Sequence, residues 1–512
     1  MSETAVAEPG TRLQKFLDRA GLRGFPWKTA TILYTISWGW LFIVRDSYWA
    51  DDWEAFKFRA SNFLINKEMG IAPWADVGFY LFESFGSGFI RLLIFLMFFG
   101  TAIFLYAISE KFFLPDYSQR KVAMLLFLLL PFNSVRLTLF TFFYTSAYFA
   151  FFLAWYVLVR FSSHRAKLLS FALFFLSFQM FSLLVFFLLP VSHLFFLEGR
   201  GNLRDAINWL RKNLVLILLP VVYWVSRSFF WGSSRTYHQI TNNKIIGFLE
   251  FIQLVAVILV VLLLLYRWSK RSYKKPILLL IVGFCVMFVG YVPYVFYGLV
   301  GYGFDVPLLF LITMLGRSDW FSRHQILQPL GFSILLIGLF GLLPSFLKRF
   351  RNQIIAAVLA VSVVFNVAFG FEYVVDHEKQ TAVITALRAS QGKNTGAEIQ
   401  VVDQTRFLNA RQRSYRERDW RGLFALAKGI ESAKRLSFVG NCSENPDSRL
   451  VLIQGPETHW QALKNWASDS DMGFKVTVDD TPGACKPEMV LSQQSSEAIP
   501  ILLYFTGANV KD

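Results

Sequence analysis

Two adjacent carboxylates, Asp51 and Asp52, follow the first long apolar stretch of the chain and are flanked by Trp49 and Trp53. Tryptophan is enriched where membrane meets water, so these indoles are expected to hold the acidic pair at headgroup level. A carboxylate there can take a proton from a hydroxyl group that attacks a lipid-linked headgroup. Neighbouring side chains on a helix point about 100° apart, so one carboxylate is expected to face the site while the other caps the following helix. The alternative is that both only cap a surface helix.

A second segment, residues 316–325, gathers cationic side chains just before an apolar stretch. Arg323 offers planar, forked donors that fit a phosphate group, and His324 adds another donor. Arg317 lies in the same segment. The segment therefore predicts a phosphate-binding site. The alternative is an arginine that extends from a helix end to water.

Trp49 and Trp53 are also candidates for substrate contact, as are other polar residues near predicted outer helix ends. Asp76 lies in a predicted surface helix over Ile71–Phe85, and Arg136 lies near an outer helix end. Arg235 and His238 share an outer loop, where a lone histidine is usually solvated.

The composition requires a membrane to position these residues. Of 512 residues, 55% are hydrophobic and 17% are charged, against about 25% charged in a soluble domain. This excludes a cytosolic enzyme, a DNA-binding factor, a disulfide-rich toxin, a collagen-like chain and a disordered chain. The formal net charge of +16 lies in the apolar part, so it indicates topology and anionic lipid as a partner, with no nucleic acid.

Uncharged stretches predict a multi-pass α-helical membrane protein of about eleven spans. They cover 29–44, 92–109, 122–135, 137–159, 168–197, 214–231 (interrupted by Arg227), 251–266, 277–304, 325–347 and 354–371. The short basic segments between them are expected to be cytoplasmic. Because 168–197 is flanked by basic segments and is too long for one helix, we expect two short helices there, and likewise a break in 122–159 at 131–136. The N-terminus is then inside and the C-terminus outside.

Three parts of the chain follow from this topology. Residues 1–28 form a cytoplasmic arm, 29–371 a transmembrane domain with a first outer loop at 45–88, and 372–512 an extracytoplasmic domain. In the last part, strand-like runs alternate with helix-compatible runs, which predicts a small α/β domain. The strand-like runs are 399–402, 450–454, 474–478 and 500–505, and the helical ones are 377–392, 420–433 and 457–467.

Two cysteines, Cys442 and Cys485, lie in this last part. In an oxidising compartment they could form a disulfide, and the alternative is two free thiols. No cysteine or histidine pattern indicates a zinc site.

The acidic pair in the first outer loop, the arginine before a late span and the outer α/β domain together resemble the GT-C superfamily of integral-membrane glycosyltransferases. The resemblance covers residues 27–371. The first motif is Asp51-Asp52, and the second is Arg323 in Ser322-Arg323-His324-Gln325-Ile326-Leu327-Gln328-Pro329. The sequence differs from the protein mannosyltransferase branch, in which an Asp-Glu pair is followed by a His-Pro-Pro element, because Ala72-Pro73-Trp74 stands in that region.

The resemblance implies transfer of a sugar from a polyprenyl-phosphate donor to a hydroxyl group of an envelope glycan or glycolipid, on the outer side of the plasma (inner) membrane. Asp51 or Asp52 would act as the base, and Arg323 would bind the donor phosphate. A single base opposite the phosphate would invert the anomeric centre. No metal is required, although a carboxylate pair could hold a divalent cation.

Two other functions remain open. A flippase for a lipid-linked glycan would use the spans and the arginines but would not need the acidic pair. A glycan polymerase or ligase is expected to carry its arginines in large late outer loops and to lack that pair.

Overall fold

A computed structural model of the chain describes most of the positions between 17 and 479. The described positions are 17–18, 20–44, 47–49, 52–53, 74, 76–112, 114, 116–136, 138–198, 203–230, 242–296, 325–390, 398–410, 413, 415–429, 437–439 and 449–479.

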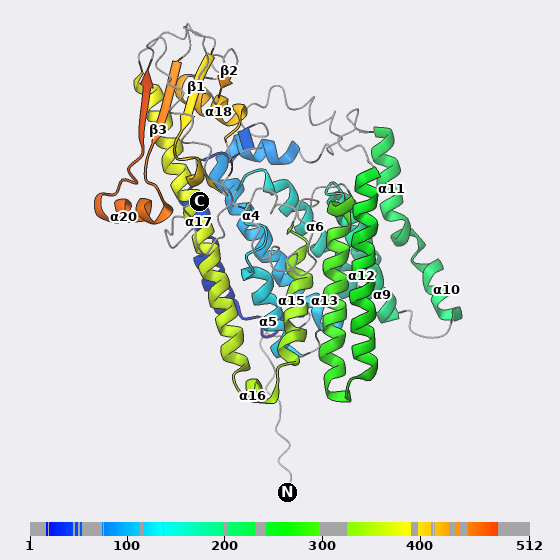
Figure 1. Ribbon diagram of the computed structural model, residues 1–512. Helices are drawn as coiled ribbons and strands as arrows, with labels where there is room; N and C mark the ends of the chain where they lie inside the picture. The colour runs from blue at the N-terminus through cyan, green and yellow to red at the C-terminus, as the bar shows by residue number, and fades with distance from the viewer. Residues whose placement is uncertain are drawn as a thin grey trace.

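Helices that run up and down form the larger part of the molecule (Figure 1). They are α2 (Trp27–Trp38) with η1 (Gly39–Phe42), α4 (Asp76–Phe112), α5 (Tyr117–Leu129), α6 (Thr141–Arg160), α7 (His164–Ser177), α8 (Ser182–Phe186), α9 (Leu188–Glu198), α10 (Leu203–Lys212), α11 (Leu214–Phe230), α12 (Asn242–Trp268), α13 (Arg271–Phe296), α15 (Gln328–Gly341), α16 (Ser345–Lys348) and α17 (Arg351–Ala389). One or more helices coincide with each predicted apolar stretch, and 168–197 overlaps α7, α8 and α9. The breaks predicted within 122–159 and 168–197 are confirmed, because residues 130–140 separate α5 from α6 and 178–181 separate α7 from α8.

Four of the described helices are long and apolar enough to cross a membrane. They are α4, α6, the part of α13 from Tyr273 to Gly290, and α17; α10 and α11 add a fifth if this pair, bent by 49°, counts as one span. These helices support a helical membrane protein. The full number of crossings and the orientation stay predictions.

Close helix contacts in the bundle depend on small residues. Where α13 crosses α15, a Cβ atom at Gly283 would lie 2.5 Å from the Leu335 amide nitrogen, and one at Gly331 would lie 2.5 Å from that of Met287. Glycine at both positions lets the two backbones approach, as is common between membrane helices.

Gly86 divides α4 into two parts. Its φ of 79° and ψ of 179° interrupt the helix, and glycine adopts this conformation without the steric cost that other residues meet. The part from Asp76 to Phe85 lies across the upper end of the bundle, and the rest descends into it (Figure 1). A separate helix ending at Phe85 is therefore confirmed, while its place at a membrane surface stays a prediction.

The helix α17 joins the bundle to the sheet. Its 39 residues extend for about 58 Å at 1.5 Å per residue, nearly twice the thickness of a bilayer core of about 30 Å. The predicted boundary between residues 371 and 372 therefore falls inside one continuous helix. The upper half of α17 reaches the strands (Figure 1).

The C-terminal part contains a four-stranded sheet in the order β2-β1-β3-β4. The strands are β1 (Glu398–Asp403), β2 (Ser437–Val439), β3 (Arg449–Gln454) and β4 (Lys475–Asp479). Both β2 and β3 pair with β1 in parallel, and β4 is antiparallel to β3. The helical elements here are η6 (Arg406–Leu408), α18 (Glu417–Lys428) and α20 (His459–Asp469).

Most of the predicted alternation of strands and helices is confirmed by these elements. The short strand β2 was not predicted. The predicted strand at 500–505 lies outside the described residues, as do Cys442 and Cys485.

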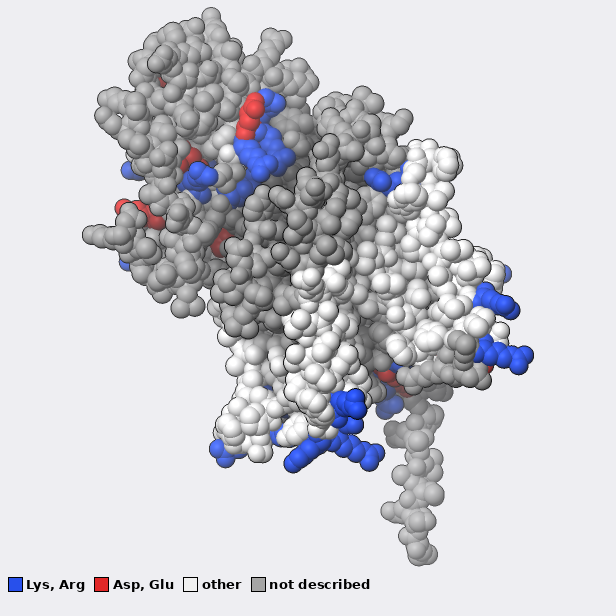
Figure 2. All heavy atoms as spheres, turned by 45° about the vertical axis from the view of Figure 1, so that its right-hand side comes forward, with Lys and Arg blue, Asp and Glu red and all other residues white. Residues whose placement is uncertain are grey.

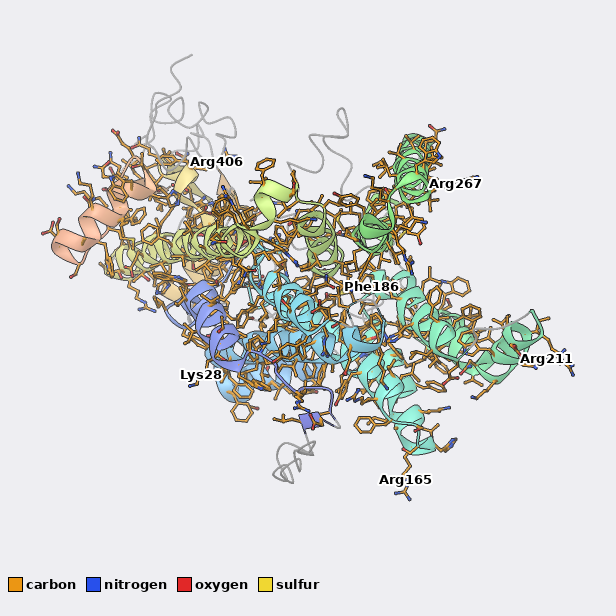
Figure 3. The ribbon with its side chains drawn as sticks, turned by 90° about the horizontal axis from the view of Figure 1, so that it is seen from below. Lys28, Arg165, Phe186, Arg211, Arg267 and Arg406 are labelled. Carbon is orange, nitrogen blue, oxygen red and sulfur yellow. The ribbon has the colours of Figure 1, made fainter. Side chains whose placement is uncertain are left out.

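Basic side chains gather at the lower end of the helices, and a second group, mixed with acidic side chains, lies on the upper part of the molecule (Figure 2). Figure 3, a view from below, labels Lys28, Arg165, Arg211 and Arg267, which lie around the bundle. The helix ends that the basic loops join therefore share one end of the molecule, as the predicted topology requires.

Candidate functional site

Asp52 is fully buried at the upper end of the bundle. Its Oδ2 accepts a hydrogen bond from the Trp49 amide at 3.1 Å, and its Oδ1 accepts one from the Phe140 amide at 2.7 Å. One side chain thereby closes the first outer loop on itself and ties it to the beginning of α6. Its neighbour Asp51 lies outside the described residues.

The bond to Phe140 is a helix cap made from a distant part of the chain. Phe140 is the N-cap residue of α6, and the first amides of a helix lack partners within the helix. A carboxylate at that end also meets the positive end of the helix dipole. Asp52 therefore caps α6. The helix that follows the acidic pair in sequence, which one member of the pair was expected to cap, lies outside the described residues.

Burial raises the pKa of Asp52 to about 7, although the amide donors and the charge of Arg91 act in the opposite direction. A pKa near neutrality suits a general base, but a base must also reach its substrate. Both oxygens of Asp52 already accept backbone hydrogen bonds inside the protein. Its geometry therefore fits a residue that positions the loop.

Arg91 lies on α4, close to the break at Gly86, and is fully buried. Its Nη2 donates to the Ser47 carbonyl at 2.6 Å, and its guanidinium carbon lies 5.1 Å from the centroid of the Trp49 ring. This buried cation holds the loop beside Asp52 and balances the negative charge there.

Arg136 is also buried, in the segment between α5 and α6. Its Nη2 donates to the Phe132 carbonyl at 2.8 Å, and its guanidinium carbon lies 3.9 Å from the centroid of Trp38 and 4.0 Å from that of Phe98. Beside it, Asn133 adopts a positive φ of 53°, a strained conformation of the kind that clusters at functional sites. Arg136 therefore lies among aromatic rings inside the protein, and its predicted contact with substrate stays a prediction.

The two tryptophans of the first loop do not face lipid headgroups. Trp49 and Trp53 are each 1% exposed. The Trp49 ring meets Tyr373 of α17 edge-on at 4.9 Å, and a Cβ atom added at Gly422 of α18 would lie 2.3 Å from the Trp53 ring. Their expected role as interface anchors is wrong, because the C-terminal part of the chain covers both indoles. Contact with substrate stays a prediction for them.

Two residues of α17 that the sequence did not single out complete the loop. Ser47 Oγ forms a hydrogen bond with His377 Nδ1, and Gln380 Nε2 donates to the Tyr48 carbonyl at 3.1 Å. Together with Tyr373 they repeat at intervals of four and three residues, which places them on one face of a helix. That spacing, directly after an apolar stretch, is the signal that could have identified them.

A buried polar network fixes the upper half of α17 to the α/β unit (residues 398–479). Lys379 Nζ lies 2.5 Å from Asp403 Oδ2 and 2.6 Å from Asn409 Oδ1. The Tyr415 hydroxyl donates to Asp376, whose other oxygen accepts from the Ala410 amide at 3.0 Å. Burial raises the pKa of Asp376. Each ionic group in this network has a partner, so it serves to join the two parts.

The remaining candidates cannot be placed relative to Asp52. Six of them lie outside the described residues: Asp51, Arg235, His238, Arg317, Arg323 and His324. The backbone of Asp76 is described in α4, but its side chain is not. The phosphate-binding segment and the proposed base therefore stay predictions.

Within the described part of the chain, no group of three or more histidine, cysteine, aspartate or glutamate side chains could hold a metal ion. The prediction that no cofactor is required stays open. No protein-family model, curated protein or solved structure matches this chain.

Proposed function

We propose that the protein is an integral-membrane glycosyltransferase that uses a polyprenyl-phosphate sugar. The observation that carries the proposal is the burial of three charged side chains, Asp52 of the first loop, Arg91 of α4 and Arg136 between α5 and α6. Burying such groups at a membrane boundary is costly, so they mark functional sites. The resemblance to the GT-C superfamily supports the same assignment.

In this proposal the chain crosses the plasma membrane about eleven times, with the basic end in the cytoplasm and the site outside. The basic side chains at the lower end (Figure 2) support this orientation. The acceptor is a hydroxyl group of an envelope glycan or glycolipid.

Asp51 acts as the base, and Asp52 positions it. Asp51 takes the proton of the acceptor hydroxyl while that oxygen forms a bond to the anomeric carbon. The bond between that carbon and the phosphate oxygen breaks, and polyprenyl phosphate leaves with the electron pair. Because attack and departure occur on opposite faces, the anomeric centre inverts.

The leaving phosphate gains negative charge and needs fixed cations. Arg323 supplies a forked donor pair, and His324 and Arg317 add donors from the same segment. Arg136 is a further candidate, because its buried side chain belongs to the segment between α5 and α6, whose Phe140 amide donates a hydrogen bond to Asp52.

The test compares Asp51→Asn with Asp52→Asn in nanodiscs, supplied with a panel of polyprenyl-phosphate sugars and envelope acceptors. Asp51→Asn is expected to lower kcat by about 10²- to 10⁴-fold without changing thermal stability. Asp52→Asn is expected mainly to lower thermal stability. Full turnover in Asp51→Asn and in the double variant would refute a base in this pair.

Phosphate recognition is tested separately, with polyprenyl phosphate itself as the probe. Arg323→Ala is expected to weaken its binding about 10- to 150-fold, the equivalent of about 1.5–3 kcal/mol. Arg323→Lys keeps the charge but loses the forked donor pair, so its affinity for polyprenyl phosphate is expected to lie between those of the wild type and Arg323→Ala. Unchanged affinity in folded Arg323→Ala would remove this segment from the site.

A flippase is distinguished by its product. Glycosyl transfer releases polyprenyl phosphate without its sugar, whereas a flippase in proteoliposomes moves the lipid to the other leaflet with the sugar attached. Transport that survives in Asp51→Asn, without release of sugar, would favour the flippase.

A further inference from the structure

The C-terminal part of the chain exposes two large apolar side chains on one helix. Trp460 is 60% exposed and Trp466 is 51% exposed, and both belong to α20. They are the exposed large hydrophobic side chains of the described residues after Ala389. Two large apolar side chains exposed on one helix are typical of a surface that contacts a membrane or another protein.

The exposed indoles belong to one continuous apolar face. At about 100° per residue, Trp460, Leu463, Trp466 and Ala467 fall within an arc of about 120°. The opposite side of α20 carries Gln461, Asn465, Ser468 and Asp469, and Lys464 lies at the border of the apolar face beside Trp460. His459 lies within this arc, next to Trp466, and Ala462 lies about 40° outside it; both are buried against the rest of the protein. The helix is therefore amphipathic, with part of its apolar face uncovered.

The position of α20 along α17 indicates what covers that face. Helix α20 contacts α17, and Ala462 packs in the large buried cluster that runs through the bundle and includes Tyr373 and Val374 of α17. Val383 and Leu387, further along α17, belong to the cluster that contains the sheet. Residues 373–374 come directly after the apolar stretch that ends at Phe371. From Arg351 to Phe371 the helix rises about 30 Å, the thickness of a bilayer core.

Figure 1 shows α20 lying across the direction of α17, beside its middle and below the strands. Figure 3 shows the same helix beyond α17, at the side of the molecule. The indoles thus lie on a helix that projects sideways at the height where α17 would leave the membrane.

We propose that α20 lies in the lipid headgroup region and docks the α/β unit onto the membrane surface. This inference rests on the proposed membrane topology but not on sugar transfer. Tryptophan prefers the headgroup region because its ring is apolar and its N–H can still bond to water or phosphate. An amphipathic helix lies in that plane with its apolar face down, and Lys464 is placed to meet anionic lipid.

Docking at this point would hold the α/β unit at a fixed height above the first loop. Trp53 of that loop packs directly against Gly422 of α18, and Tyr373 of α17 packs against Trp49. The lipid contact of α20 and the loop contact of α18 belong to the same α/β unit, so membrane binding at α20 would steady the site that contains Asp52.

Photo-crosslinking of the full chain in nanodiscs of phosphatidylethanolamine and phosphatidylglycerol, one copy per disc, tests this contact. The photoreactive residue p-benzoylphenylalanine replaces Trp460 or Trp466, and the matched controls replace Gln461 or Ser468 on the polar face of the same helix. After irradiation, intact-protein mass spectrometry detects lipid adducts. Adducts are expected at positions 460 and 466, and the adduct signal is expected to be lost at 461 and 468.

Equal adduct yields on the two faces, or none at 460 and 466 in protein that remains monodisperse, would overturn the proposal. A second measurement changes the lipid and leaves the protein as it is. With anionic phosphatidylglycerol omitted, the adducts at 460 and 466 are expected to persist, because the apolar face and not Lys464 carries the contact. Neither readout depends on turnover, so a failure of lipid docking and a failure of glycosyl transfer are distinguishable.

Discussion

The two ends of the helix bundle differ in how far their charged side chains are exposed. The lower end carries exposed ion pairs such as that of Lys212 with Glu198, whose side chains are 64% and 38% exposed, although Arg120 beside Glu110 is 9% exposed. At the upper end Asp52, Arg91 and Lys379 are wholly buried. Exposed charge can set the orientation of the chain at little energetic cost, whereas each buried charge needs a partner that the fold must supply.

The difference in cost is large. Exposed ion pairs typically contribute about 0–1 kcal/mol, whereas removal of one member of a buried pair costs about 3–5 kcal/mol because the other charge is left without a partner. The upper end therefore depends on residues far apart in sequence being present together.

The largest effect is expected at Lys379. Replacement by methionine keeps the volume but leaves Asp403 buried without its cation, so the free energy of unfolding is expected to fall by about 3–5 kcal/mol. Thermal denaturation of the purified protein, followed through the α/β unit, measures the loss.

The matched control is Arg421→Ala, which breaks the pair of Arg421 with Glu417 on α18, where the side chains are 37% and 52% exposed. A loss below about 1 kcal/mol is expected there. Similar losses of stability in Lys379→Met and Arg421→Ala would show that burial does not determine how much an ion pair contributes to stability.

Asp52 should make stability depend on pH. Its pKa is about 7 when folded, against an ordinary value of 3.8 for an aspartate side chain in water. Between those values the unfolded chain has lost the proton that the folded chain keeps, so stability falls as the pH rises towards 7 and levels off above it. The loss is on the order of a few kcal/mol.

Asp52→Asn removes this titration but keeps the shape of the side chain. Its midpoint of thermal denaturation is expected to change less than that of wild type between pH 5 and pH 8. Since other groups titrate in both proteins, the difference between the two curves isolates Asp52. Parallel curves would contradict the buried, titrating carboxyl group.

A smaller effect is expected at Gly422. Glycine to alanine within a helix usually gains about 1 kcal/mol, but here the new methyl group meets the Trp53 ring. Overpacking of this kind costs about 1–3 kcal/mol, so Gly422→Ala is expected to lower the stability. Trp53→Leu in the same chain should restore part of it, and a gain from Gly422→Ala alone would show that the loop does not pack there.

Much of the fold could be predicted because it depends on local patterns. Uncharged runs located the helices, and the parity of the basic loops located the breaks between α5 and α6 and between α7 and α8. The boundary at residue 371 missed the continuity of α17, since the loss of apolar residues marks the end of a membrane and not the end of a helix.

Less of the candidate site than of the fold could be predicted from the sequence. The acidic pair stood out, but the burial of Trp49 and Trp53 depends on α17 and α18, more than three hundred residues later in the chain. Nothing local distinguishes an indole that faces lipid from one that faces a helix. The cap that Asp52 forms on Phe140 likewise depends on how the elements meet.

The smallest effect is expected at the lower end, where Glu110 Oε2 lies 3.5 Å from both Arg120 and Arg160. Glu110→Gln removes the charge at a side chain that is 39% exposed, beside Arg120 and Arg160, which are 9% and 14% exposed. Arg120 keeps its contacts with the rings of Tyr106 and Tyr117, and Arg160 keeps its hydrogen bond to the Asp18 carbonyl. The free energy of unfolding should therefore fall by only about 1 kcal/mol. Orientation should not change, because lysines and arginines set it and acidic residues contribute little. A reporter fused after Asp512 should therefore stay outside the membrane in this variant as in wild type, while thermal denaturation registers the small loss. A reversed reporter would mean that the balance of charge at this end, and not its basic residues alone, sets the direction of the chain, and a loss of several kcal/mol would place Glu110 with the buried charges of the other end.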